Sequence, residues 1–166
     1  MRLTADIILK GTHWEKLREI LIDKLGIFSR VVDYFVIATS IGIASDLIDE
    51  ADGDFSMTIA RDTYQTNYDL SDIFDFMLKN ALLTSNHINL SMDERMKMAF
   101  DDDYNDDKIS LGSLLVKFAN YGAKKILEIC NEHDLDTMDQ LIELIKGYMD
   151  NNYKDRINDL SPFDIE

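Results

Sequence analysis

The sequence contains very few residues that interrupt a chain or brace it covalently. It has one cysteine, Cys130, and one proline, Pro162, among 166 residues. A single cysteine excludes an internal disulfide and suits a reducing cytosol. With one proline and only seven glycines, the composition favours long helices over a turn-rich β fold. A length of 166 residues is typical of one domain with a sizeable core.

Cations and catalytic motifs are also scarce. The 17 lysines and arginines are outnumbered by 32 aspartates and glutamates, which gives a net charge of -15. We therefore expect no direct binding to a nucleic-acid backbone and none to an anionic membrane surface. HExxH, GxGxxG, P-loop and GxSxG motifs are all missing, and the three histidines are scattered. We expect no cofactor, no metal and no enzymatic activity.

Two short segments match chemical sites only in part. Asp52 opens a segment that begins like an EF-hand calcium loop, but Met57 replaces the glycine of the sharp turn and Thr63 replaces the bidentate glutamate. Cys130 and His133 would share a helix face, as a nucleophile and its base could. Two nearby glutamates would raise the pKa of that thiol, which makes it a poor nucleophile.

The longest apolar run, Gly26–Ala44, falls short of the roughly 20 apolar residues that span a bilayer. The N-terminus lacks the apolar region and cleavage site of a signal peptide, so we expect a cytoplasmic protein. Because the run is apolar nearly all round, it predicts a central helix buried on most sides, capped by Ser29 and preceded by a helix that Gly26 ends.

The remaining pattern predicts a mainly α-helical single domain over residues 1–150. It contains about six helices around the central one, and at most a small two-stranded sheet formed by residues 3–9 and 55–59. Residues 151–166 are expected to form a polar tail, partly ordered at most. Capping boxes are predicted at Thr12, Ser91 and Thr137, and a helix cap at Ser71.

Three further helices are predicted from apolar residues at helical spacing. The helix after Ser71 carries Ile73, Phe74, Met77, Leu78, Ala81 and Leu82. The short helix after Ser91 carries Met92, Met96, Ala99 and Phe100. A longer helix runs from Ser110 to about Cys130, and Gly122 inside it is interpreted as the point of a close crossing with another helix.

The acidity is concentrated in the middle of the chain, because residues 45–107 hold 16 of the 32 acidic side chains and 4 of the 17 basic ones. Asp69, Asp72 and Asp75 would share one helix face. The carboxylates that we expect to contact a partner are Asp46, Asp49, Glu50, Asp52, Asp54, Asp69, Asp72, Asp75, Asp101, Asp102, Asp103, Asp106 and Asp107.

This acidic segment has several interpretations. A solvated surface that keeps the protein soluble is the simplest one. A second is a docking face for a protein partner with a basic surface. A third is a DNA mimic or phage-encoded inhibitor, whose carboxylates take the place of phosphates on a DNA-binding protein. The sequence is also compatible with self-association.

Two apolar segments carry a family resemblance. Residues 25–44 hold the pattern Gly26, Phe28, Asp33, Phe35, Ala38 and Gly42, and residues 118–122 read Phe-Ala-Asn-Tyr-Gly. In this the chain resembles small accessory proteins of bacterial DNA phosphorothioation (Dnd) systems, and Asp72–Leu83 fits their middle helix. The resemblance implies a non-enzymatic accessory component of a DNA-modification, restriction or antiviral defence complex. It supplies no catalytic residues.

Overall fold

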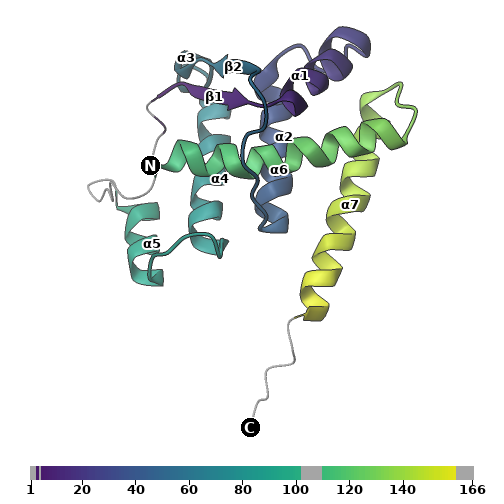
Figure 1. Ribbon diagram of the computed structural model, residues 1–166. Coiled ribbons are helices and arrows are strands. Elements are labelled where there is room, and N and C mark those ends of the chain that lie inside the picture. The colour runs from purple at the N-terminus through teal and green to yellow at the C-terminus, as the bar shows by residue number, and fades with distance from the viewer. Residues whose placement is uncertain (1–2, 4, 102–109, 160–166) are drawn as a thin grey trace.

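The computed structural model describes residues 3, 5–101 and 110–159, and the side chains of these up to residue 152. Over these ranges the chain is a mainly helical single domain, with seven α-helices and a two-stranded antiparallel sheet, as predicted. The elements follow in the order β1 (Ile7–Lys10), α1 (Thr12–Arg18), η1 (a π-helical turn, Glu19–Lys24), α2 (Val31–Ser45), β2 (Ser56–Ile59), α3 (Arg61–Gln65), α4 (Tyr68–Thr84), α5 (Met92–Phe100), α6 (Leu111–Glu132) and α7 (Met138–Asp159) (Figure 1).

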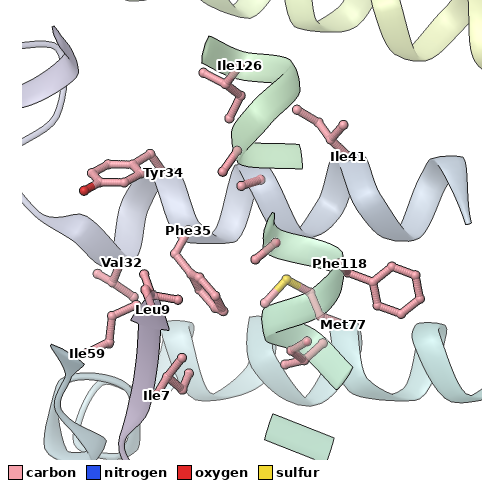
Figure 2. Close-up of a cluster of buried hydrophobic side chains, with 14 of the residues drawn as sticks. Ile7, Leu9, Val32, Tyr34, Phe35, Ile41, Ile59, Met77, Phe118 and Ile126 are labelled. Carbon is pink, nitrogen blue, oxygen red and sulfur yellow. The ribbon is translucent and has the colours of Figure 1, made fainter. Parts of the chain in front are cut away.

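The predicted central helix is α2. Its side chains at positions 32, 34, 35, 38, 39, 41 and 43 are all buried, so this helix is covered on most sides. Phe35 and the α4 residue Met77 fill the space between α2 and α4, with Leu9 of β1 beside Phe35 (Figure 2). Phe35 also stacks on Phe74 of α4, at 5.8 Å between ring centroids.

Helices α2 and α6 cross with their backbones in contact. A Cβ atom added to Gly122 of α6 would overlap the carbonyl oxygen of Ala38 in α2, and one added to Gly42 of α2 would overlap the carbonyl oxygen of Phe118 in α6. Each helix therefore needs a glycine where the other passes. This confirms the close crossing that was predicted at Gly122, and it adds Gly42 as the second contact point.

The two strands pair as predicted, with Ile7 opposite Ile59 and Lys10 opposite Ser56. The buried side chains of β1, Ile7 and Leu9, lie on its core face. The strand begins at Ile7, four residues after Leu3, and just before it Asp6 accepts a hydrogen bond from the N–H of Arg61 (2.7 Å) at the start of α3. Helix α3 itself was not predicted.

Two predicted capping boxes are confirmed. Ser91 N donates to Glu94 Oε2 (2.8 Å) while Ser91 Oγ accepts from Glu94 N (3.3 Å). Thr137 and Gln140 make the same reciprocal pair, at 3.2 and 3.3 Å. Gly26, with φ of 61°, ends the segment before α2 as expected.

The other three predicted caps are wrong. Helix α1 begins at Thr12 itself, because the Thr12 N–H donates to the carbonyl of Asp52 (2.9 Å). Helix α2 begins two residues after Ser29, at Val31. Helix α4 begins at Tyr68, where the Asn67 side chain accepts from the N–H of Leu70 (3.2 Å), so Ser71 lies inside the helix.

We predict that Gly122→Ala lowers the free energy of unfolding by about 3 kcal/mol, because the methyl group would force two packed backbones apart. Gly147→Ala is the matched control: it lies in α7, where an added Cβ meets no heavy atom within 4 Å. Alanine should stabilise that helix by up to about 1 kcal/mol. Urea denaturation measures both, and equal effects at the two positions would contradict the close crossing.

Candidate functional site

The predicted partner-binding carboxylates lie in two different environments. The first is the acidic loop, residues 46–54, which connects α2 to β2. Three of its carboxylates pair with lysines of α6: Asp49 with Lys124 (2.9 Å), Asp52 with Lys124 (3.6 Å) and Glu50 with Lys117 (2.5 Å). The loop backbone follows the same helix, since Asp49 N donates to the carbonyl of Lys117 (3.0 Å). Two lysines of this chain therefore pair with three of the five carboxylates of the acidic loop.

Beneath the acidic loop lies a buried polar cluster that the sequence analysis did not identify. Asn120 Oδ1 accepts from Trp14 Nε1 (2.9 Å), and Asn120 Nδ2 donates to the carbonyl of Asp49 (3.2 Å). His13, only 3 % exposed, lies with Nε2 3.3 Å from Asn120 Oδ1 and Nδ1 2.8 Å from Asp52 Oδ1. The cluster joins α1, α6 and the acidic loop.

The two bonds of Asn120 determine the orientation of its amide. Trp14 Nε1 can only donate and the carbonyl of Asp49 can only accept, so exchanging the amide oxygen and nitrogen would lose both bonds. Both ring nitrogens of His13 therefore face acceptors. The imidazolium form satisfies both acceptors, whereas either neutral tautomer satisfies one. His13 and Lys124 both contact the Asp52 carboxylate and so hold the acidic loop against α1 and α6.

Asp46 also has partners within the chain. It ends α2 with φ of 51°, and its carboxylate accepts from Asn86 N (3.1 Å) and Asn86 Nδ2 (2.8 Å). His87 Nε2 lies 2.9 Å from the Asp46 carbonyl oxygen. These bonds fasten the connection between α4 and α5 to the end of α2. Asp54 is exposed and has no partner among the described residues.

The second environment is the outer face of α4. Asp69 and Asp72 are exposed there, and neither forms an ion pair or hydrogen bond through its carboxylate within the described part of the chain. Asp75 is half-buried and pairs with Lys79 (2.7 Å). Asp101 caps the end of α5. The other predicted residues, Asp102, Asp103, Asp106 and Asp107, lie outside the described residues.

Large apolar side chains surround these α4 carboxylates and continue onto α5. We call this set the α4–α5 surface. Its exposed fractions are Tyr68 86 %, Ile73 40 %, Phe76 68 %, Met92 58 %, Met96 46 % and Phe100 61 %. Four of these residues had been assigned to the apolar pattern of their helices. In the structure α5 instead buries Met98 and Ala99, with Leu82 and Ile88, in a small core of its own.

Arg95 explains which side of α5 faces α4. Its guanidinium donates to the carbonyls of Leu82 (3.3 Å), Ser85 (2.7 Å), Ile88 (2.5 Å) and Leu90 (3.0 Å). These oxygens lie at the end of α4 and in the connection that follows, so Arg95 must face α4. Met92, Met96 and Phe100 are exposed and spaced four residues apart, so they form one outward stripe.

The stripes of α4 and α5 meet at Lys79. Its Nζ lies 5.5 Å from the ring centroid of Phe100, and Lys79 is one helical turn from Phe76. Helix α5 runs beside the second half of α4 (Figure 1). The exposed side chains of the first half of α4 therefore continue into those of α5. The sequence contained a signal for this surface, because α5 has apolar residues on two of its sides. A helix of nine residues that packs against one neighbouring helix buries only one of those sides.

No group of three or more His, Cys, Asp or Glu side chains among residues 3, 5–101 and 110–159 could hold a metal ion. Burial raises the pKa of the Cys130 thiol to about 11, so the thiol stays protonated at neutral pH. No helix over the same ranges is long and apolar enough to cross a membrane.

Comparisons with known proteins do not assign a family: no protein-family model, curated protein or solved structure matches this chain.

We predict that Cys130 in the folded protein reacts with iodoacetamide at pH 8 on the order of a hundredfold more slowly than free cysteine, because the thiolate is the reactive form and little of it is present. Mass spectrometry over time measures the rate. The same protein unfolded in urea is the control and should react at an ordinary rate. Fast alkylation of the folded protein would reopen the interpretation of Cys130 as a nucleophile.

A second prediction concerns Asp52, whose pKa is lowered by its hydrogen bond with His13, with Lys124 adding to the effect. The resulting stabilisation is present above the unfolded-state pKa of about 3.9 and is lost as the pH falls through the lower folded-state value. Asp52→Asn should therefore have its full destabilising effect at pH 5 and above, and the difference from wild type should shrink towards pH 2.

Denaturant unfolding at a series of pH values measures this difference. Asp54→Asn, in the same loop, controls for the loss of one carboxylate. A difference between Asp52→Asn and wild type that stayed constant from pH 5 to pH 2 would show that folding does not lower the pKa of Asp52.

Proposed function

We propose that this protein is a non-enzymatic protein-interaction subunit that binds its partner through the α4–α5 surface. The observation that carries the proposal is the six-residue apolar set just described, three of whose members are aromatic and two methionine. A monomer rarely leaves so many large apolar side chains exposed side by side, and such patches usually mark binding sites. Aromatic residues and methionine are also enriched at protein–protein contacts.

The framework beneath the surface supports the same proposal. Arg95 holds the turn between the helices through four carbonyls, and Asp46 fastens that turn to α2. The backbone of the α4–α5 surface is therefore held in place before any partner arrives, which lowers the entropic cost of binding. The methionines can still adapt their side chains to the partner.

The biological setting that we propose follows from the sequence resemblance alone. It is an accessory role in a bacterial DNA-modification, restriction or antiviral defence complex. A DNA mimic that inhibits a DNA-binding protein is the alternative, and one observation favours it: Asp69 and Asp72 have no partner on the same helix face. Against it, the acidic loop pairs its carboxylates with Lys117 and Lys124, which leaves fewer charges to imitate phosphates.

To test the function, the protein is co-purified with each product of the genes that neighbour its own. We predict a stoichiometric complex with one of them, which Phe76→Ser/Phe100→Ser weakens by at least about 2 kcal/mol, the scale of interface hot spots. The matched control is Ile8→Ser/Leu47→Ser, because both residues are exposed and apolar (51 % and 45 %) but lie on β1 and in the acidic loop.

Two outcomes would contradict the proposal. One is a protein that stays monomeric with every neighbouring product, and the other is a complex that both variant pairs weaken equally. Measuring affinity at several salt concentrations distinguishes the accessory subunit from the DNA mimic. A DNA mimic should lose affinity steeply with salt and compete with DNA, whereas an apolar interface should tolerate salt.

A further inference from the structure

We propose that the occupant of the α4–α5 surface is an amphipathic helix of the partner, with an apolar stripe flanked by lysine or arginine. This inference rests on the proposed function and adds the chemistry of the partner to it. Helices that lay an apolar face onto methionine-rich and aromatic surfaces are a recurring mode of recognition.

The first argument is the charge beside the apolar side chains. Asp69 and Asp72 carry uncompensated negative charge next to Tyr68, Ile73 and Phe76. Two basic side chains of this region are already engaged, Lys79 with Asp75 and Arg95 with four carbonyls, and the third, Lys97, is exposed on α5. A partner with cations beside its apolar stripe would therefore gain attraction as well as apolar contact.

The same charges argue against a second copy of this chain as the occupant. Two copies that met through this surface would bring Asp69 and Asp72 of each towards those of the other, and each copy carries a net charge of -15. Like charges facing one another across an interface cost free energy. An anionic membrane is disfavoured by the same repulsion.

The second argument is the shape of the apolar set. Tyr68 and Phe76 are separated by about 12 Å along α4, and Met92 and Phe100 by about 12 Å along α5, at 1.5 Å per residue. The two stripes follow one another, because α5 lies beside the second half of α4 and they meet at Lys79. A stripe of about 25 Å matches the apolar face of a helix of about 17 residues.

The test uses a synthetic probe whose composition is known. An 18-residue amidated peptide of leucine and lysine, with leucine on one helical face, carries a fluorescent label, and anisotropy measures its binding. The control peptides are a scrambled sequence of the same composition, which has no apolar face, and a leucine–glutamate version with the same pattern.

We expect the leucine–lysine helix to bind at least about tenfold more tightly than either control peptide. Asp69→Asn/Asp72→Asn should weaken it by about tenfold, the sum of two exposed charge pairs. The control Asp134→Asn/Asp136→Asn removes the same charge from the connection between α6 and α7 and should change binding less than twofold. Phe76→Ser/Phe100→Ser should weaken binding by at least about tenfold, with Ile8→Ser/Leu47→Ser unchanged.

Several results would overturn this inference. Equal binding of the scrambled peptide would mean attraction by charge alone, and equal effects of the two aspartate pairs would mean attraction by net charge rather than by this surface. Tighter binding of the leucine–glutamate peptide would exclude a basic partner.

Failure of the inference and failure of the proposed function give different results. If a natural complex is lost in Phe76→Ser/Phe100→Ser but not in Asp69→Asn/Asp72→Asn, the α4–α5 surface binds a partner that is not basic. If neither pair affects a natural complex, the partner does not bind at the α4–α5 surface, and the proposed function fails as well.

Discussion

The structure depends on one constraint, the approach of α2 and α6 to backbone contact at Gly42 and Gly122. That contact sets the distance between the buried central helix and the helix that carries Lys117, Asn120 and Lys124. Because α6 lies so close, Asn120 can reach Trp14 and the acidic loop, and the two lysines can pair with its carboxylates. A packing feature in the core therefore decides where the charges of the surface are compensated.

The strong negative charge of this protein is consequently distributed in two ways. In the acidic loop it stabilises the fold, because His13, Lys117 and Lys124 hold the loop against α1 and α6. On the outer face of α4 it has no such role, since Asp69 and Asp72 have no partner in the described chain. Carboxylates that look equivalent in the sequence thus differ in what they can offer another protein. Those beside exposed aromatic side chains are the ones that can contribute to binding.

The core was largely predictable, and the candidate site was not. Apolar periodicity is a local property, so α2, α6 and the pairing of β1 with β2 could be predicted, and the glycine inside α6 indicated the crossing. The cap at Thr12 failed because its N–H is used by Asp52, 40 residues further along the chain. The apolar pattern of α5 was misassigned because Arg95, by binding four carbonyls, decides which side faces α4. The first error comes from a partner distant in sequence and the second from hydrogen bonds to carbonyls 5 to 13 residues earlier, and helical spacing reveals neither.

The crossing of α2 and α6 also determines when this protein can fold during synthesis. The two glycines are about 80 residues apart, so the largest contact of the core closes a long loop. Until α6 has left the ribosome, the apolar α2 lacks its main neighbour and exposes its surface to other nascent chains. Folding of the core should therefore begin late, after most of the chain has been made.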